Sequence, residues 1–306
     1  MGVEVDKQRT TYIVEKALVA MDGRQGLFSE GVFRPEEMFI EVVKSHGERV
    51  GKPEFAPNAV FLTTAFVFGD DTTRLFKRIT DPDGVSEYAW IFDPKEAGKK
   101  RDEVIINGCA EFFRPAGYNR RVVLEWPYNL RLLEQKYGGD VRNFFDKYNG
   151  DMEEIVRAMV VRPRAKTEEK REKEAFTRYG PKIAPLVVQW MNQYDLYKFR
   201  NSNGGGLPVD FQVARVLIQT GAVILDKPEN AHQVTTNVGK SLGLMISEHG
   251  WEPRRVSESL WNVGNRGCNQ KRHSDCPLQD ECDRLISRKP YDKDGKFDPK
   301  DTGRWE

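Results

Sequence analysis

The stretch LPVDFQVARVL, residues 207–217, contains the pattern that decides the fold. Val213, Val216 and Leu217 recur at helical spacing after Asp210, so they share one face of a helix that can be buried. Asp210 stands directly before this helix, where an aspartate most often caps the N-terminus. The same carboxylate could instead lie at the mouth of a cleft, where it would activate water or stabilise a developing cation. The stretch therefore predicts a helix that begins at a capping or catalytic aspartate.

Helical periodicity extends from this stretch through nearly all of the chain, and alternating strand patterns are scarce. The segment that ends near Gly51 predicts two helices separated by a loop. Residues 101–113 predict a helix with Cys109 on its apolar face, whereas residues 81–100 are typical of a turn-rich connection. The sequence therefore predicts the all-α fold class.

The charge balance limits the classes of function. The 306 residues include 48 Lys and Arg against 47 Asp and Glu, which leaves a formal net charge of +1. This balance excludes a bulk polycation, although a local basic face would still permit nucleic-acid binding. No apolar run approaches the ~20 residues that a membrane-spanning helix needs, and the sequence does not begin with an apolar signal core. We therefore expect a cytoplasmic protein with no membrane partner, associated with the nucleoid if the cell is prokaryotic.

Three of the four cysteines lie in the segment CNQKRHSDCPLQDEC, residues 268–282, which follows the pattern C-x4-H-x2-C-x5-C. Three thiolates and one imidazole at this spacing can bind one metal centre. Spacing alone does not distinguish zinc from an iron–sulfur cluster, and reduced thiols beside a surface histidine are the alternative. Cys109 stands apart, and we expect a small core residue at that position.

The segment GPKIAPL, residues 180–186, predicts a tight turn that leads into an apolar helix. Backbone N–H groups at such a helix N-terminus can bind a phosphate. Lys182 would lie in the first turn, where its amine could act as a nucleophile. An ordinary helix start is the more common meaning of such a segment.

Several motifs occur in a fixed order: GYNRR (117–121) with LLEQKYGGDV (132–141), then GPK (180–182), then PVDFQVARV (208–216), then the cysteine segment (268–282). In this order they resemble the motifs of the helix-hairpin-helix DNA glycosylases, the HhH-GPD superfamily. Endonuclease III and the adenine-specific mismatch glycosylases are the types that the sequence resembles most. The resemblance extends over about residues 58–284.

The resemblance implies two helical domains with a cleft between them. Residues 58–207 would form a helical barrel that contains the helix-hairpin-helix near residues 168–192. Residues 208–285 would form the domain that carries the cysteine loop. Residues 1–57 would pack with this C-terminal domain, and residues 286–306 would form a polar tail.

The resemblance also implies roles for individual residues. Asp210 matches the catalytic aspartate of the family, and Lys182 matches the lysine that forms a Schiff base in members that also cleave the strand. The expected DNA contacts are Arg178, Gly180, Lys182, Arg120, Arg121, Lys271 and Arg272. The expected metal ligands are Cys268, His273, Cys276 and Cys282, which would hold a [4Fe–4S] cluster, with zinc as the alternative.

Some residues depart from the family pattern. Arg178 stands where the hairpin has its first glycine, and Gln212 stands where the family has a histidine. The cysteine segment lacks the family's second cysteine, and His273 lies at the spacing of that missing ligand. Cys109, or no fourth ligand at all, is the alternative.

The resemblance implies a DNA base-excision glycosylase that acts as a monomer on duplex DNA containing a damaged or modified base. The enzyme would flip the base and hydrolyse its N-glycosidic bond, and Lys182 would add AP-lyase activity. Two alternatives stay open. One is an enzyme of the same fold that acts on a modified nucleobase or nucleotide outside repair, and the other is a non-catalytic, metal-stabilised DNA-binding protein.

Overall fold

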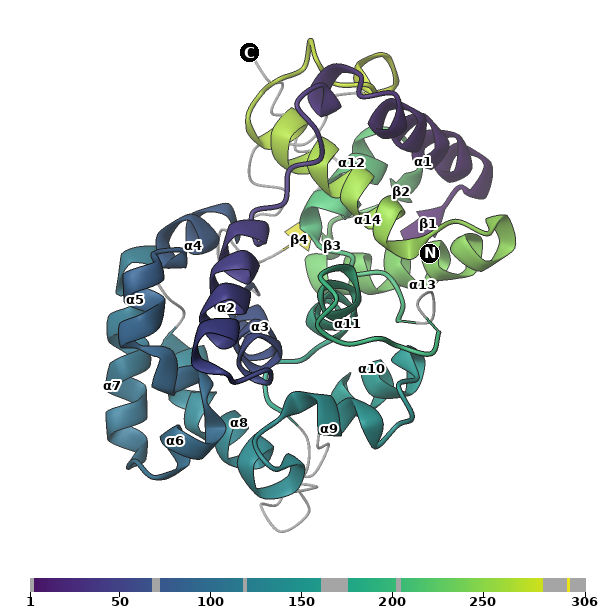
Figure 1. Cartoon of the computed structure of the whole chain (residues 1–306). Helices are drawn as coiled ribbons and strands as arrows, with labels where there is room; N and C mark the ends of the chain where they lie inside the picture. The colour runs from purple at the N-terminus through teal and green to yellow at the C-terminus, as the bar shows by residue number, and fades with distance from the viewer. Residues whose placement is uncertain are drawn as a thin grey trace. The chain divides into compact units, whose positions relative to one another are not determined.

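The structure is a computed structural model, and it describes residues 3–67, 72–117, 120–160, 176–201, 205–282 and 296–297 (Figure 1). Within these residues the chain is predominantly helical, which confirms the prediction of a mainly helical fold. The helices are α1 (Lys7–Asp22), α2 (Glu37–Val50), α3 (Phe55–Thr64), α4 (Thr72–Ile79), α5 (Pro82–Glu87), α6 (Pro94–Gly98), α7 (Asp102–Phe113), α8 (Arg120–Tyr137), α9 (Val141–Asp146), α10 (Met152–Val160), α11 (Ile183–Gln193), α12 (Phe211–Gln219), α13 (Ala231–His249) and α14 (Pro253–Asn262). No helix among the described residues is both long enough and apolar enough to cross a membrane.

The chain divides into two compact units. The terminal unit consists of Met1–Phe33 and Gly206–Glu306, and the central unit consists of Arg34–Gly205. Each unit has its own hydrophobic core. Buried members of the terminal core include Ile13, Leu217 and Leu260, and buried members of the central core include Phe61, Trp126 and Phe145.

The boundary between the units differs from the one that the sequence suggested. Residues 1–57 were expected to pack with the C-terminal domain, but residues 34–57 belong to the central unit. The reason is that α2 packs along α3, and its Phe39 and Val43 are buried in the central core. The periodicity of α2 showed an apolar face without showing which core would cover it.

Two small antiparallel sheets were missed by the sequence analysis. Strand β1 (Val3–Val5) pairs with β2 (Val223–Leu225), and β3 (Glu229–Asn230) pairs with β4 (Lys296–Phe297), which lies within the segment expected to be a polar tail. Strands of two or three residues are too short to show a period of two. Each pair joins segments far apart in the chain, so no local hairpin signal marks it.

The expectation of a turn-rich connection over residues 81–100 was wrong, because this segment contains the short helices α5 and α6. Each begins with an aspartate followed by proline, Asp81 before α5 and Asp93 before α6. Both aspartate side chains accept hydrogen bonds from backbone N–H groups two and three residues later. Aspartate at the cap and proline at the first helical position are helix-start signals that the sequence contained.

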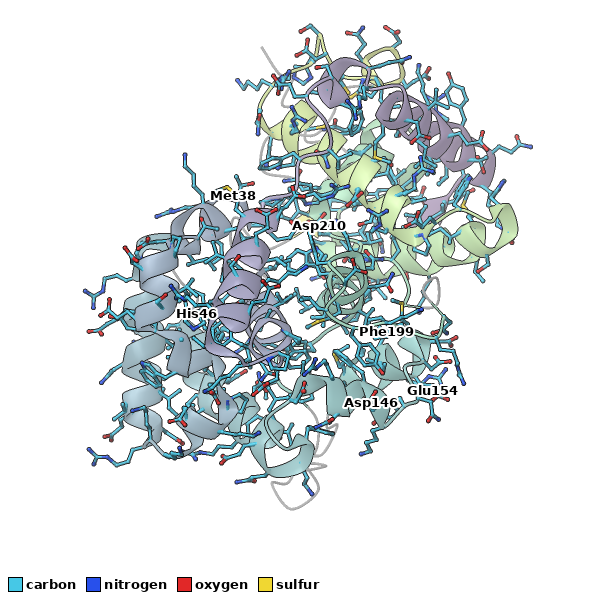
Figure 2. All side chains as sticks on the ribbon, in the orientation of Figure 1. Met38, His46, Asp146, Glu154, Phe199 and Asp210 are labelled. Atoms are coloured by element: carbon cyan, nitrogen blue, oxygen red, sulfur yellow. The ribbon has the colours of Figure 1, made fainter. Side chains whose placement is uncertain are left out.

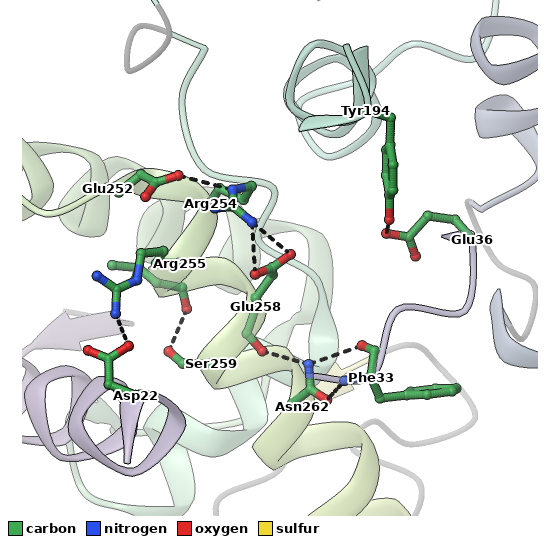
Figure 3. A network of polar contacts seen from close by, with 11 residues as sticks. Asp22, Phe33, Glu36, Tyr194, Glu252, Arg254, Arg255, Glu258, Ser259 and Asn262 are labelled. Atoms are coloured by element: carbon green, nitrogen blue, oxygen red, sulfur yellow. Dashed lines mark hydrogen bonds and ion pairs between the residues drawn. The ribbon is translucent and has the colours of Figure 1, made fainter. Parts of the chain in front are cut away.

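The chain passes from the terminal to the central unit at Phe33–Arg34, and each unit fixes its own end of this crossing (Figure 3). In the terminal unit, Asn262 on α14 accepts a hydrogen bond from Phe33 N at 3.1 Å and donates one to Phe33 O at 3.3 Å. In the central unit, the hydroxyl of Tyr194 donates to Glu36 Oε1 at 3.0 Å. Burial and the neighbouring Glu36 carboxylate raise the pKa of Tyr194.

Candidate functional site

Asp210 lies at the N-cap of α12 in the terminal unit and is 8% exposed (Figure 2). Its Oδ1 atom accepts hydrogen bonds from Gln212 N at 2.8 Å and from Val213 N at 3.2 Å. These bonds confirm the capping role that the local sequence favoured. Both end on Oδ1, so the cap itself does not use Oδ2.

The turn formed by residues 176–182 lies in the central unit and is held by α8 and α3. The buried Asn129 on α8 accepts from Thr177 N at 2.9 Å and donates to Thr177 O at 3.2 Å, as a second backbone strand would. The hydroxyl of Tyr179 donates to Phe61 O at 2.9 Å, and the two rings stack at 4.5 Å. This turn therefore has one fixed position within the unit. The first part of the expected helix-hairpin-helix, from about residue 168 to residue 175, is outside the described residues.

Within this turn Arg178 has a φ of +74°, in the left-handed region that favours glycine. Its guanidinium makes two parallel hydrogen bonds to Glu125, Nε to Oε2 at 2.7 Å and Nη2 to Oε1 at 2.8 Å. The side chain expected to contact phosphate therefore binds a carboxylate of its own unit. At Gly180, by contrast, a Cβ atom would meet nothing within 4 Å.

Lys182 is the N-cap residue of α11, one position before the first turn in which the sequence placed it. Its Nζ donates to Val67 O at 3.3 Å. The carbonyl of Gly180 accepts from Ile183 N and Ala184 N, both at 3.0 Å. Lys182 belongs to the central unit and Asp210 to the terminal unit, so the two candidate catalytic residues are described separately.

The other expected DNA contacts of the central unit, Arg120 and Arg121, are exposed at the start of α8. Arg74 on α4 places its Nη2 atom 3.3 Å from where a Cβ atom on Gly117 would be. Gly117 has a φ of +70° and ends the turn after α7, so Arg74 is a cation near this turn that the sequence did not single out.

The cysteine segment folds against the end of α12. Cys268 lies in a π-helical turn, Val263–Asn269, that continues α14. The Sγ atoms of Cys268 and Cys282 both lie within hydrogen-bonding reach of one acceptor, Gln219 Oε1, at 3.6 and 3.3 Å. Cys276 Sγ lies 3.5 Å from where a Cβ atom on Gly267 would be. The three thiols expected to be metal ligands therefore gather in one part of the terminal unit.

Burial dominates the electrostatics of these thiols. It is the largest cause of the raised pKa values, about 11 for Cys268 and about 12 for Cys276, and the neighbouring Cys282 acts in the same direction. For Cys268, the guanidinium of Arg215 acts in the opposite direction, as a nearby charge and as a hydrogen-bond partner. Without a metal, Cys268 and Cys276 are therefore protonated near neutral pH.

Arg215 lies beneath the cysteine segment and is fully buried. Its Nη2 atom donates to Gly264 O at 2.6 Å and to Gln212 Oε1 at 2.5 Å, and its Nη1 atom donates to Asn269 Oδ1 at 3.3 Å. Its Nε atom is buried and has no hydrogen-bond partner among the described residues. Burial lowers the pKa of this guanidinium, while nearby Cys268 and Asp210 raise it. Thiolates bound to a metal would add further compensating negative charge. The sequence analysis assigned no role to this residue beyond a motif match.

The donor set fits a thiolate-bound metal in its chemistry, although among the described residues no three His, Cys, Asp or Glu side chains are already arranged as ligands. His273 lies in the same segment, its carbonyl accepts from Cys276 N at 3.1 Å, and its Nε2 atom is buried. Cys109 is fully buried in the core of the central unit, and burial raises its pKa well above the ordinary value. This position confirms the small core residue that the sequence predicts for Cys109.

The N-terminal segment holds the cysteine segment in place. Leu27 N donates to Asp275 O at 2.9 Å, and a Cβ atom on Gly26 would overlap that same oxygen. Glu281 forms ion pairs with Arg9 and Lys16 of α1, both at 2.9 Å. The hydrogen bond from Lys16 is the main reason that the pKa of Glu281 falls to about 2.

The remaining expected DNA contacts, Lys271 and Arg272, also lie in the cysteine segment. Arg272 donates to Asp275 Oδ2 from Nη2 at 2.8 Å, and this bond lowers the pKa of Asp275. Lys271 is exposed and has a φ of +56°. Of the two, Lys271 has the more accessible side chain for a phosphate.

Comparison with known proteins identifies no relative. No protein-family model, curated protein or solved structure matches this chain. The functional argument therefore depends on the residues and their local geometry.

Proposed function

We propose that this chain is a DNA base-excision glycosylase of the helix-hairpin-helix type, with a structural metal centre in its cysteine segment. In this proposal the central unit is the helical barrel of that family, and the terminal unit is its cluster-bearing domain. Duplex DNA with a damaged or modified base would be the substrate.

The observation that carries the proposal is the position of Asp210. Its carboxylate is mostly buried at the N-terminus of α12, where its Oδ1 atom accepts two backbone hydrogen bonds. A carboxylate fixed in this way can stabilise the positive charge that develops on a sugar as its bond to a base breaks. It is also the residue that matches the catalytic aspartate of the family motif.

The turn of residues 176–182 gives independent support. The family's hairpin has a glycine at the position of Arg178, and Arg178 adopts the left-handed backbone that a glycine there would supply. The backbone of this turn is thus compatible with a hairpin whose N–H groups bind phosphate, even though the residue has changed.

The proposed reaction is hydrolysis of the N-glycosidic bond. The bond between C1′ and the base nitrogen breaks, its electron pair leaves with the base, and the base takes up a proton. Asp210 stabilises the cationic sugar and orients the water that adds to C1′. The proton that this water loses balances the proton that the base takes up. Positioning of the flipped base costs a few kcal/mol, which contacts to the DNA backbone must supply.

Lys182 would give the enzyme a second activity. Attack of its amine on C1′, in place of water, forms a Schiff base from which the 3′ phosphate can be eliminated. Lys182→Ala is expected to abolish the adduct that borohydride traps while base release continues through water. An adduct of undiminished yield in this variant would exclude Lys182 as the nucleophile.

The proposed metal centre would be held by Cys268, Cys276 and Cys282 with His273 as the fourth ligand. A [4Fe–4S] cluster, or zinc as the alternative, would supply cross-links that order the segment and present Lys271 to the DNA. The fully buried guanidinium of Arg215 would compensate part of the negative charge of the thiolates.

Asp210→Asn tests the catalytic role apart from the structural one. Asparagine caps a helix about as well as aspartate, so the unfolding free energy should change by less than about 0.5 kcal/mol. Release of a damaged base from a duplex oligonucleotide panel should fall at least about 100-fold, while DNA binding is retained. Asp226→Asn is the matched control, since it removes an exposed carboxylate of the same unit. Wild-type turnover by Asp210→Asn would refute the assignment.

One observation favours a second candidate function. Arg178 is bound to Glu125 and Lys182 donates to a backbone carbonyl, so two of the expected phosphate contacts already have partners within the protein. A hairpin with weaker phosphate binding suits an enzyme that acts on a modified nucleobase or nucleotide outside duplex DNA. Turnover of free nucleosides or nucleotides, with none on duplex DNA, would establish this alternative.

A further inference from the structure

Gln219 occupies a special place in the cysteine segment. It is the last residue of α12, it is 1% exposed, and its Oε1 atom lies between the sulfurs of Cys268 and Cys282. These two cysteines stand at opposite ends of the segment. One buried amide therefore connects the beginning and the end of the proposed metal loop.

The hydrogen bonds of the Gln219 amide depend on whether the two sulfurs carry protons. A buried amide is destabilising unless it is hydrogen-bonded. In the structure Gln219 accepts hydrogen bonds from two thiols, which are weak donors. Oε1 faces both sulfurs, an arrangement that suits protonated thiols and would be repulsive toward two thiolates.

A second residue on the same face points to thiolates at this site. Arg215 lies four positions before Gln219, is fully buried, and has a buried Nε atom without a hydrogen-bond partner among the described residues. Arg215 and Gln219 both contact Cys268. A guanidinium N–H group beside a sulfur is a donor that requires an acceptor, and a thiolate is a much better acceptor than a thiol.

We propose that Gln219 is a positioning residue of the metal centre, with its amide nitrogen turned towards Cys268 and Cys282 when these sulfurs bind metal. Metal binding removes the thiol protons, so the sulfurs become acceptors and the amide oxygen would face two negative charges. A half-turn of the amide places Nε2 there instead. The N–H···S hydrogen bonds then lower the electron density on both sulfurs and hold the ends of the loop together.

The inference rests on the proposed metal centre and is tested by metal binding rather than by base release. Gln219→Leu removes both the donor and the acceptor at nearly constant volume. Thr220→Val is the matched control, because Thr220 is the next residue, is also buried, and its hydroxyl bonds only to carbonyls of α12 among the described contacts. Zinc affinity is measured by competition with a chromophoric chelator. The reduction potential is measured after anaerobic reconstitution with iron and sulfide.

Gln219→Leu is expected to weaken zinc binding about tenfold or more and to shift the reduction potential to a more negative value. Its metal-free stability should equal or exceed that of the wild type, which a variant that merely damaged the fold could not show. Wild-type affinity and potential in Gln219→Leu would overturn the proposal. A wild-type protein that binds neither zinc nor iron would overturn it together with the metal centre. Base release by the same preparation would then decide separately whether the glycosylase proposal survives.

Discussion

Single residues in this protein combine a structural and a proposed chemical role. Asp210 caps α12 through one oxygen and is the proposed catalytic carboxylate. Arg178 holds a left-handed turn together through Glu125 and stands where a hairpin glycine is expected. At this scale, the useful substitutions are those that change one role and keep the other.

Substitution of Arg178 by glycine and by alanine should have different effects. The left-handed backbone costs a residue with a Cβ atom about 1–2 kcal/mol, and the half-exposed ion pair with Glu125 returns about 0.5–1 kcal/mol. Both variants lose the ion pair, but only glycine removes the strain. Arg178→Gly should therefore be more stable than Arg178→Ala by about 1 kcal/mol in urea denaturation. Glu125→Gln measures the ion pair alone, and equal stability of the glycine and alanine variants would show that the strain is absent.

His46 on α2 should make the central unit sensitive to mild acid (Figure 2). Burial, then the positive charges of Arg49 and Lys52, lower the pKa of this histidine below its ordinary value of 6.5. Its Nδ1 atom accepts from Arg49 Nη2 at 3.0 Å, so the native ring is neutral. The unfolded chain therefore binds more protons than the native one just below pH 6.5, and stability falls as the pH falls through that window.

The measurement is the unfolding free energy of wild type and His46→Gln at pH 7.5, 6.5 and 5.5. The wild type should lose stability between pH 6.5 and 5.5 beyond any loss shown by the variant. Parallel curves for the two proteins would mean that His46 titrates alike in the native and unfolded states.

At the scale of elements, α12 organises the terminal unit's candidate site. Asp210 stands at its N-cap, Arg215 lies on its buried face, and Gln219 ends it. The π-helical turn after α14 packs directly against this helix. Gly264 in that turn has no side chain, so its backbone can lie close to Gln212 on α12. The metal segment and the proposed catalytic carboxylate thus depend on one helix of nine residues.

Gly264→Ala should push the π-helical turn away from α12. A Cβ atom at this position would lie 2.7 Å from Gln212 O and 2.9 Å from Gln212 Cβ, which backbone atoms of a helix cannot easily relieve. We expect a loss of about 1–3 kcal/mol in unfolding free energy, with weaker metal binding. Gly243→Ala on α13 is the control, because nothing lies within 4 Å of its Cβ position and alanine favours a helix. A Gly264→Ala variant as stable as Gly243→Ala would contradict the close packing.

At the scale of the whole molecule, the two units have separate cores, and the cysteine segment belongs to the terminal one. Metal binding adds stability only to the unit that holds the ligands. Metal binding should therefore stabilise the terminal unit and leave the stability of the central unit unchanged.

Chelation of the metal-loaded protein should reduce amide hydrogen-exchange protection in α12 and α14 and leave that of α3 and α8 unchanged. Cys276→Ala should give the same pattern without a chelator, since it removes a proposed ligand. Cys109→Ala, in the central core, should retain the metal and reduce protection mainly in the central unit. Equal loss of protection in both units after chelation would show that the metal does not act through the terminal unit.

The sequence by itself determined the local features of this protein. Helical spacing, the cap at Asp210 and the grouping of three cysteines depend on residues within one or two turns of each other, so the linear pattern contains them. The Asp-Pro starts of α5 and α6 were present in the same way, although they were read as turns.

Only the tertiary structure decided which segments meet. The unit boundary at Phe33, the pairing of β1 with β2, the binding of Arg178 to Glu125 and the placement of Gln219 between two thiols all join residues many positions apart. An apolar or polar face in a sequence states that a partner is needed without stating which partner it is. The partner is selected when the whole chain packs, because packing and hydrogen bonding must be satisfied for all segments at once.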